Sequence, residues 1–345
     1  MLYKTENPHG GDVYDGNIEL DFSANTNPFG TPEAVKAAVS ACLDGLSAYP
    51  DPYCRRLVSA VAEHENIPKE YVLCGAGAAE LIYSFAAAEK PRKAVELAPT
   101  FAEYALPLAG AEIKRFYLKE ADSFRLTRDL IDFIEETGPD AVFLCSPNNP
   151  TGLQADEELI IEAANKCRDI GCRLFLDECF MDLADEPKSF VPMLSDYPNV
   201  LILKAFTKAY GMAGLRLGYC MSADEELLSG MSRAVQPWNI STAAQEAGAA
   251  ALSETAFLEK TRGLIKKERP RMADELKKLG FAVFGSNVNF LLIKGRPGLD
   301  ESLLEEGIKI RNCANFHGLA EGFYRVAVKL PEENDRLIEA IKGCL

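Results

Sequence analysis

Lys208 directly follows the apolar run from Val200 to Phe206, stands beside Thr207, and is followed by Arg216. An amine at the end of a buried strand is partly desolvated, which lowers its pKa and leaves a neutral nucleophile that can form a Schiff base with an aldehyde. The hydroxyl of Thr207 and the paired donors of Arg216 are suited to a phosphate. Pyridoxal 5'-phosphate carries both groups, so these residues predict it as the cofactor. Taken alone, Lys208 is more simply a structural lysine whose ammonium reaches solvent from a strand end.

An acidic pair follows another short apolar run. Residues Arg173 to Leu176 read as a buried strand that ends in Asp177 and Glu178. A carboxylate at that position can pair with a protonated pyridine nitrogen, and the cationic ring can then accept electrons from the alpha carbon of a substrate. The alternative is that Asp177 caps the following helix or loop, which is a common use of Asp after a strand.

A tight loop of Ser, Pro, Asn, Thr and Gly residues covers residues 146–152, after the apolar strand from Ala141 to Cys145. Its Asn-Pro and Thr-Gly steps are ordinary turn chemistry. Asn149 adds an amide that could donate a hydrogen bond to the phenolic oxygen of the cofactor. The sequence therefore predicts a turn that also carries a cofactor contact.

A glycine-rich loop separates the predicted strand from Tyr71 to Cys74 from a helical pattern over residues 78–88. Gly77 allows the backbone N–H groups of Ala78 and Ala79, at the start of a helix, to approach a phosphate closely. Such turns are frequent in α/β proteins, and this one has neither the Walker spacing nor the dinucleotide spacing.

All of these loops begin where predicted strands end, and ligands of open α/β sheets bind at the carboxyl ends of the strands. We therefore expect the loops to converge on one crevice. Strands and helices alternate to about Gly230, which is typical of an α/β fold with a mostly parallel sheet. The segment from Leu215 to Met221 follows Lys208 too closely for a helical crossover, so we expect it to be antiparallel to its neighbour.

The remaining pattern predicts a large domain over residues 46–250, a small α+β domain over residues 251–345, and an N-terminal segment, residues 1–45, that joins the small domain. Thr31 should cap a helix that runs to Asp44. A long helical stretch from Thr242 to Leu279 should kink or break at Pro270. Strands are expected near residues 281–284, 289–293, 308–311 and 324–328, with a last helix from about Glu332.

Composition narrows the class of protein. The chain has 345 residues, 48% of them hydrophobic, which is enough for a full core and two lobes. Its net charge of −15 argues against nucleic acid and anionic membrane partners, and an anionic substrate would need a local cluster of cations. The 10 cysteines are scattered, with no Cys-x-x-Cys, so we interpret them as core thiols and expect no metal site. Without a signal core or a membrane-spanning apolar run, the default location is the cytoplasm.

The order of these motifs resembles the fold-type-I pyridoxal-phosphate enzymes of the aspartate aminotransferase superfamily, over nearly the whole chain. Two branches are similar: histidinol-phosphate aminotransferase, and the threonine-phosphate decarboxylase of cobalamin biosynthesis. Several strings resemble the decarboxylase more closely. They are His9-Gly10-Gly11, residues 20–25 (LDFSAN), Gln236-Pro237-Trp238, residues 311–316 (RNCANF) and residues 323–326 (FYRV).

The resemblance implies roles for the cofactor residues. Lys208 should hold the cofactor as a Schiff base, Asp177 should contact the pyridine nitrogen, and Asn149 the phenolic oxygen. Phe101 should stack on the ring, although it could instead be a core aromatic at a helix start. Tyr49 should reach across a homodimer interface to the partner's cofactor phosphate; without the resemblance, it is an extended residue before a proline. The expected phosphate contacts are Gly77, Ala78, Ala79, Thr207 and Arg216.

The resemblance also implies a phosphorylated amino-acid substrate. Arg325 should bind the carboxylate, and Arg311, together with His9, the substrate's own phosphate, because guanidinium groups offer paired donors. Asn25 is the other expected substrate-binding residue. The alternatives are an exposed strand charge for Arg311 and a terminal residue without a role for His9.

Two departures bear on the reaction. Phe180 stands where aminotransferases of this type usually carry a tyrosine that bonds the phenolic oxygen, and Ala205 stands where relatives place Ser or Thr against the phosphate. The decarboxylase branch tolerates phenylalanine at the first position. We therefore expect decarboxylation of L-threonine O-3-phosphate to (R)-1-aminopropan-2-yl phosphate. The alternatives are a histidinol-phosphate or related aminotransferase that uses 2-oxoglutarate and glutamate, and a non-enzymatic cofactor-sensing regulator.

Overall fold

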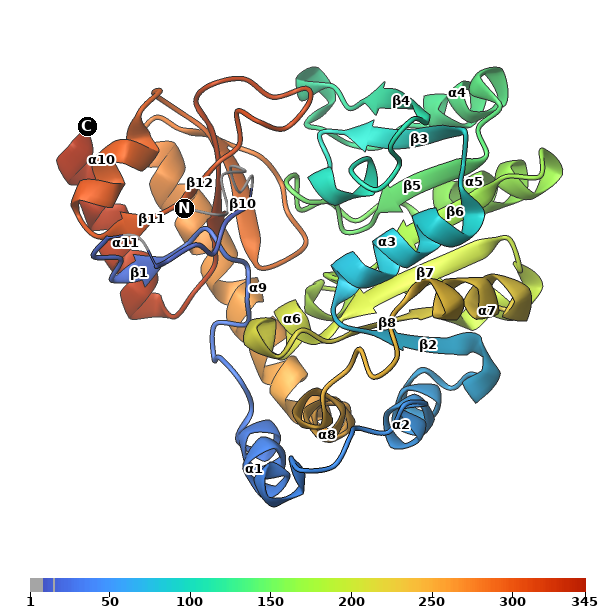
Figure 1. Ribbon diagram of the computed structural model, residues 1–345. Coiled ribbons are helices and arrows are strands. Elements are labelled where there is room, and N and C mark those ends of the chain that lie inside the picture. The colour runs from blue at the N-terminus through green and yellow to red at the C-terminus, as the bar shows by residue number, and fades with distance from the viewer. Residues whose placement is uncertain (1–8, 15) are drawn as a thin grey trace.

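A seven-stranded sheet lies at the core of one part of the computed structural model, which describes residues 9–14 and 16–345 (Figure 1, right). Only β8 runs against the other strands, since it pairs antiparallel with both β2 and β7. The prediction of an α/β fold with a mostly parallel sheet is confirmed, and so is the antiparallel strand after Lys208. In order across the sheet, the strands are β2 (Val72–Gly75), β8 (Gly218–Met221), β7 (Val200–Ala205), β6 (Arg173–Asp177), β5 (Ala141–Cys145), β3 (Lys93–Ala98) and β4 (Glu112–Tyr117).

The central strands are continuous apolar runs because helices cover both faces of the sheet. Alternate residues of β5 show this: Phe143 belongs to the core on one face, and Val142 and Leu144 belong to the core on the other. The first face is covered by α3 (Ala78–Glu89) and α7 (Glu225–Ala234). The second is covered by α2 (Arg55–Glu65), α4 (Asp129–Thr137), α5 (Glu157–Asp169) and α8 (Thr242–Ala251).

Two predictions about helices were wrong. Helix α1 (Glu33–Ala41) has no side-chain cap, because the Thr31 hydroxyl donates to the Gly211 carbonyl at 2.8 Å instead. The long helical stretch is interrupted at residues 252–254, before α9 (Thr255–Lys278), and α9 continues through Pro270. The helix therefore breaks between α8 on the sheet and α9, whose C-terminal half belongs to a second core.

The C-terminal part of the chain forms that second core around a four-stranded sheet of order β12-β13-β10-β9 (Figure 1, left). The single strand predicted over residues 308–311 is two strands. The first, β11, pairs in parallel with β1, and the second, β12, pairs with β13, so the chain passes from one sheet to the other at Ile310. The elements are β1 (Leu20–Asp21), β9 (Ala282–Val283), β10 (Phe290–Lys294), α10 (Leu299–Glu305), β11 (Ile308–Lys309), β12 (Arg311–Asn312), β13 (Phe323–Ala327) and α11 (Pro331–Cys344).

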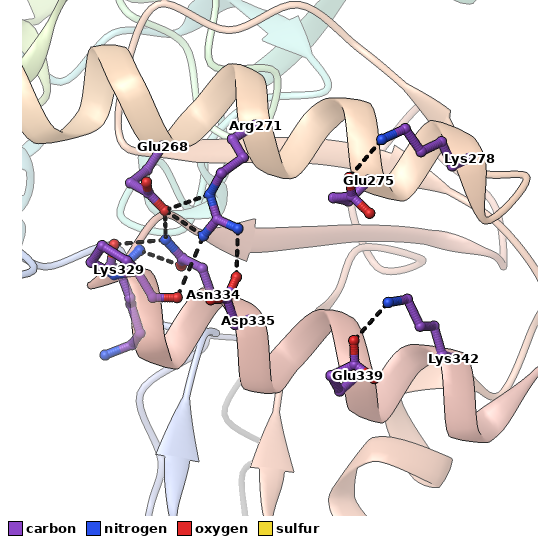
Figure 2. Close-up of polar contacts among 10 residues, drawn as sticks. Glu268, Arg271, Glu275, Lys278, Lys329, Asn334, Asp335, Glu339 and Lys342 are labelled. Carbon is purple, nitrogen blue, oxygen red and sulfur yellow. Dashed lines mark hydrogen bonds and ion pairs between the residues drawn. The ribbon is translucent and has the colours of Figure 1, made fainter.

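Helices α9 and α11 are joined by a polar network (Figure 2). Glu268 on α9 is 2% exposed and accepts hydrogen bonds from Arg271 on its own helix and from the Asn334 amide on α11, the latter at 3.1 Å. Asn334 also donates to the Lys329 carbonyl at 2.8 Å, and Arg271 pairs with Asp335. Because Glu268 is buried with these donors around it, the network fixes α11 against α9.

The N-terminal segment contacts both parts of the molecule, since β1 pairs with β11 while α1 packs on α8. The domain boundaries at residues 45 and 250 stay a prediction. Within the residues that the structure describes, no helix is both long and apolar enough to cross a bilayer. The same residues contain no group of three or more His, Cys, Asp or Glu side chains placed to hold a metal ion.

Candidate active site

A cavity of about 410 Å³ lies at the carboxyl ends of the central strands and extends to β12 and β13. The structure brings most of the predicted site residues to its walls. Three do not line it: Gly77 lies directly behind Arg216, Asn25 is buried beside Arg325, and Tyr49 is on the surface. The predicted residues that line the cavity are His9, Ala78, Ala79, Phe101, Asn149, Asp177, Thr207, Lys208, Arg216, Arg311 and Arg325.

Lys208 lies in the short helix α6 (Phe206–Ala209), which begins where β7 ends. Its pKa is lowered to about 8, first by burial and then by the positive charges of Arg325 and Arg216. Its ammonium lies 5.9 Å from the centre of the Phe180 ring, and Phe180 packs edge-on against Phe290. Lys208 can therefore be a neutral nucleophile near physiological pH.

Asp177 ends β6 and is 4% exposed. One of its carboxylate oxygens accepts from the Cys179 N–H at 2.9 Å, and the other accepts from the Tyr104 hydroxyl at 2.6 Å. Burial raises the pKa of Asp177, whereas the hydrogen bonds from Cys179 and Tyr104 act to lower it. The carboxylate is thus fixed in orientation and lines the cavity.

The glycine-rich loop and Arg216 are packed closely together. Gly77 caps α3 with a φ of +90°, and a Cβ built there would lie 2.7 Å from Nη2 of Arg216. The loop is held by Glu80, whose Oε2 accepts from the Ala76 N–H and from the Asn239 amide, each at 2.6 Å. The start of a twelve-residue helix, with a guanidinium beside it, is a suitable site for a phosphate group.

The loop over residues 146–152 is fixed by Asn148. Its side chain accepts from the Thr100 hydroxyl at 2.8 Å and donates to the Pro99 carbonyl at 3.0 Å. This leaves the neighbouring Asn149 facing the cavity, where its Oδ1 accepts a hydrogen bond from Arg325.

Arg325 and Arg311 are directly opposite each other in the pairing of β13 with β12, so both project from the same face of the sheet. Arg325 is 6% exposed, and burial lowers its pKa to about 10. It donates to Asn149, to the Ser23 carbonyl at 2.6 Å and, with the amide oxygen of Asn25 turned toward it, to Asn25 at 3.0 Å. These acceptors are all neutral, so the buried charge has no anion among them.

The outer part of the cavity contains His9 and Phe101. The ring of His9 lies 5.5 Å from that of Phe101, and its Nε2 contacts Glu103. Arg115 and Glu96 form an ion pair in the same wall, beside His317. The cavity is therefore lined by more cations than anions, although the chain as a whole carries a net charge of −15.

Sequence reasoning missed Tyr104 and Glu80, which support the site from behind. Tyr104 could have been noticed only as an aromatic residue three positions after Phe101, and Glu80 only as an acidic residue in the first turn of a predicted helix. Their roles depend on contacts between distant segments. Tyr49 is 79% exposed and contacts Trp238, with the rings tilted by 30° and their centres 4.7 Å apart.

The family model for "Aminotransferase class I and II" matches residues 17–341. Threonine-phosphate decarboxylase of Salmonella typhimurium is 37% identical over 98% of this chain and 96% of its own length. The crystal structure of histidinol-phosphate aminotransferase from Clostridium acetobutylicum has a TM-score of 0.88 at 31% identity, covering 94% of this chain and 98% of that chain. Histidinol-phosphate aminotransferase from Sinorhizobium meliloti, solved in complex with pyridoxal 5'-phosphate, has a TM-score of 0.86 at 23% identity. The match covers 95% of this chain and 92% of that chain.

Proposed function

This chain belongs to the aminotransferase class I and II family, and within that family we propose that it decarboxylates L-threonine O-3-phosphate to (R)-1-aminopropan-2-yl phosphate. The observation that carries a carboxylate-bearing substrate is Arg325, a buried guanidinium whose hydrogen-bond acceptors are neutral, and the choice of decarboxylation rests on the 37% identity to a threonine-phosphate decarboxylase. A buried cation whose hydrogen-bond acceptors are all neutral is costly, and an anionic group of the substrate would compensate the charge. The similarity to a threonine-phosphate decarboxylase supports the same substrate.

The cofactor of the family, and of this chain, is pyridoxal 5'-phosphate. The residues present fit it: a buried amine of lowered pKa, a buried carboxylate at the end of β6, and a glycine that leaves no room for a Cβ beside Arg216. When bound, the cofactor supplies an aldehyde and a ring that accepts the electron pair released at the alpha carbon. In this proposal Lys208 binds the aldehyde, Asp177 the pyridine nitrogen, Asn149 the phenolic oxygen, and Phe101 stacks on the ring. The phosphate is held by Gly77, Ala78, Ala79, Thr207 and Arg216.

The two arginines of β12 and β13 orient the substrate. Arg325, with Asn25, binds the carboxylate, and Arg311, with His9, binds the substrate's phosphate. Two anion sites on one face of the sheet suit a substrate that carries a carboxylate and a phosphate. Their positions decide which bond of the alpha carbon faces the cofactor.

Lys208 is the group that can move a proton at the alpha carbon. With a pKa of about 8 it exchanges a proton near neutral pH, which suits a general acid and base. After carbon dioxide has left, its ammonium form can donate the proton that takes the place of the carboxylate on the alpha carbon.

We propose that the active enzyme is a homodimer in which Tyr49 reaches the partner's cofactor phosphate. Tyr49 and the neighbouring Trp238 are exposed, and Leu43, Leu46 and Tyr53 nearby in the chain are more than half exposed. Large apolar side chains that gather on a surface mark an interface. Mixing inactive Tyr49→Ala and Lys208→Ala variants should restore activity, because a hybrid dimer would contain one intact site. No recovery from refolded mixtures would contradict shared sites.

The test of the reaction is an incubation of the cofactor-loaded protein with L-threonine O-3-phosphate, following carbon dioxide and amine together. We expect both in equal amounts without any amino acceptor. Arg325→Gln should lower kcat/KM by about 30-fold or more, because the substrate's carboxylate loses its charged partner. Arg336→Gln is the matched control, since Arg336 is in the same part of the molecule but pairs with the surface residue Glu19.

The runner-up is an aminotransferase acting on histidinol phosphate, favoured by the 31% identity to such an enzyme over 94% of the chain. Arg325 and Arg311 would then bind the two carboxylates of glutamate. The proposal fails if phosphothreonine releases no carbon dioxide while histidinol phosphate and 2-oxoglutarate yield glutamate.

A further inference from the structure

Tyr104 is a buried tyrosine whose hydroxyl donates to Oδ2 of Asp177 at 2.6 Å. It ends the short 3-10 turn Ala102–Tyr104, just after Phe101. Its ring stacks on Phe143 of β5 with centres 5.5 Å apart, and meets Phe101 edge-on at 5.7 Å. The hydroxyl is thus positioned by the packing of two neighbouring strands and the loop beside them.

The Tyr104 hydroxyl is the donor in this hydrogen bond, because an ionised carboxylate can only accept. The pKa of Tyr104 is raised well above its usual value, first by burial and then by the charge of Asp177. The hydroxyl therefore stays protonated and donates a hydrogen bond to the carboxylate. Asp177 receives one donor on each oxygen, from Cys179 and from Tyr104. The carboxylate cannot rotate without breaking one of these bonds.

We propose that Tyr104 is a positioning residue, which keeps the Asp177 carboxylate ionised and aimed at the pyridine nitrogen of the cofactor. The inference rests on the role proposed above for Asp177. A carboxylate at 4% exposure needs donors to stay charged, and hydrogen bonds to the charged form favour it. Without the hydroxyl, Oδ2 would have one donor fewer, and the protonated, neutral form of Asp177 would be favoured. The neutral acid would pair less strongly with a protonated nitrogen.

The experiment compares the affinity of the apoprotein for pyridoxal 5'-phosphate and for 1-deazapyridoxal 5'-phosphate, in which a C–H replaces the ring nitrogen. Both probes carry the aldehyde and the phosphate, so their contacts with Lys208 and Arg216 are alike. Equilibrium dialysis gives both dissociation constants. The wild-type protein should prefer the natural cofactor, and Tyr104→Phe should reduce that preference by about 10- to 100-fold, the usual range for a hydrogen bond to a charged group.

Tyr219→Phe is the matched control. Its hydroxyl also donates to a buried carboxylate, that of Glu65, at 2.6 Å, but Tyr219 does not line the cavity. The control should leave the preference unchanged, whatever it does to stability.

The outcomes separate Tyr104 from Asp177. A wild-type protein with no preference between the probes, or an Asp177→Asn variant that keeps the preference, would overturn the role of Asp177 and the inference with it. A wild-type preference that survives in full in Tyr104→Phe would overturn the inference alone, as would an equal loss of affinity for both probes. If Tyr104→Phe does not fold, 3,5-difluorotyrosine can be placed at position 104, where its hydroxyl is a stronger hydrogen-bond donor than that of tyrosine. This substitution should increase the preference for pyridoxal 5'-phosphate over the 1-deaza probe, and an unchanged preference would refute the proposal.

Discussion

The substitution Gly77→Ala adds one methyl group next to Arg216 and so tests the proposed phosphate site. The new Cβ would lie 2.7 Å from Nη2 and 3.2 Å from Cζ of Arg216, and the backbone there has a φ of +90°. The atoms that it meets are at the end of a flexible side chain. We therefore expect the fold to survive and Arg216 to move away from the position in which it faces the phosphate.

The cost divides into two parts. A side chain at the φ of +90° and ψ of 166° of Gly77, a region that is essentially restricted to glycine, costs about 1 to 3 kcal/mol of folding stability. Displacing Arg216 removes a charge-assisted hydrogen bond to the cofactor phosphate, which is worth about 1.5 to 3 kcal/mol, or about 10- to 100-fold in affinity.

Gly110→Ala separates the two parts, because Gly110 has a φ of +89° and no atom within 4 Å of the added Cβ. Urea unfolding of the apoproteins and titration with pyridoxal 5'-phosphate give the two quantities. Both variants should lose stability because both place a side chain at a positive φ, but only Gly77→Ala should lose cofactor affinity. If Gly77→Ala binds the cofactor as tightly as Gly110→Ala, Arg216 is not the phosphate ligand that we propose.

Two further predictions concern stability. The folded-state pKa of Lys208, about 8, is below its ordinary 10.5. Burial of the ammonium therefore destabilises the folded state by its full amount below pH 8, and this destabilisation decreases as the pH rises toward 10.5. Lys208→Met should therefore stabilise the apoprotein at pH 7 by up to about 3 kcal/mol and by less at pH 10, and a gain that does not depend on pH would refute this reasoning. Asn334→Ala should cost about 2 to 3 kcal/mol, because Glu268 then loses its donor from α11, whereas Asp335→Ala, at an exposed ion pair of the same network, should cost under about 1 kcal/mol. Urea unfolding measures the free energy of unfolding of both variants. Equal losses in Asn334→Ala and Asp335→Ala would show that the burial of Glu268 does not set the cost of removing a donor (Figure 2).

The sequence was most informative where one strand and the loop after it carry the signal. Apart from Arg173 and Lys204, the strands before Asn149, Asp177 and Lys208 are apolar without alternation, which is what a sheet buried on both faces requires. Since ligands bind at the carboxyl ends of such strands, the meeting of these residues at one cavity could be predicted without any structure.

The wrong predictions about helices lie at two positions, Thr31 and Pro270, where only the local sequence preference was considered. Thr31 has the right side chain for a helix cap, yet its hydroxyl bonds the carbonyl of Gly211, far along the chain. Pro270 lacks an N–H, but the chain breaks instead at residues 252–254, where it leaves the sheet for the second core. At Thr31 a tertiary contact outweighs the local preference.

Tyr104 and Glu80 could not have been assigned from the sequence for a similar reason. Each contacts a functional segment from behind, Tyr104 through Asp177 and Glu80 through the Ala76 N–H and Asn239. No spacing in the sequence encodes such a contact.

The reaction itself is tested most directly by turnover of L-threonine O-3-phosphate in D₂O, with the amine and the remaining substrate examined by mass spectrometry. Decarboxylation removes the carboxylate and returns one proton from solvent to the alpha carbon. We predict an aminopropanol phosphate with one carbon-bound deuterium, an equal amount of carbon dioxide, and unlabelled residual substrate. Residual phosphothreonine carrying deuterium at the alpha carbon, without carbon dioxide, would mean that the C–H bond is broken instead, and would contradict the proposed decarboxylation.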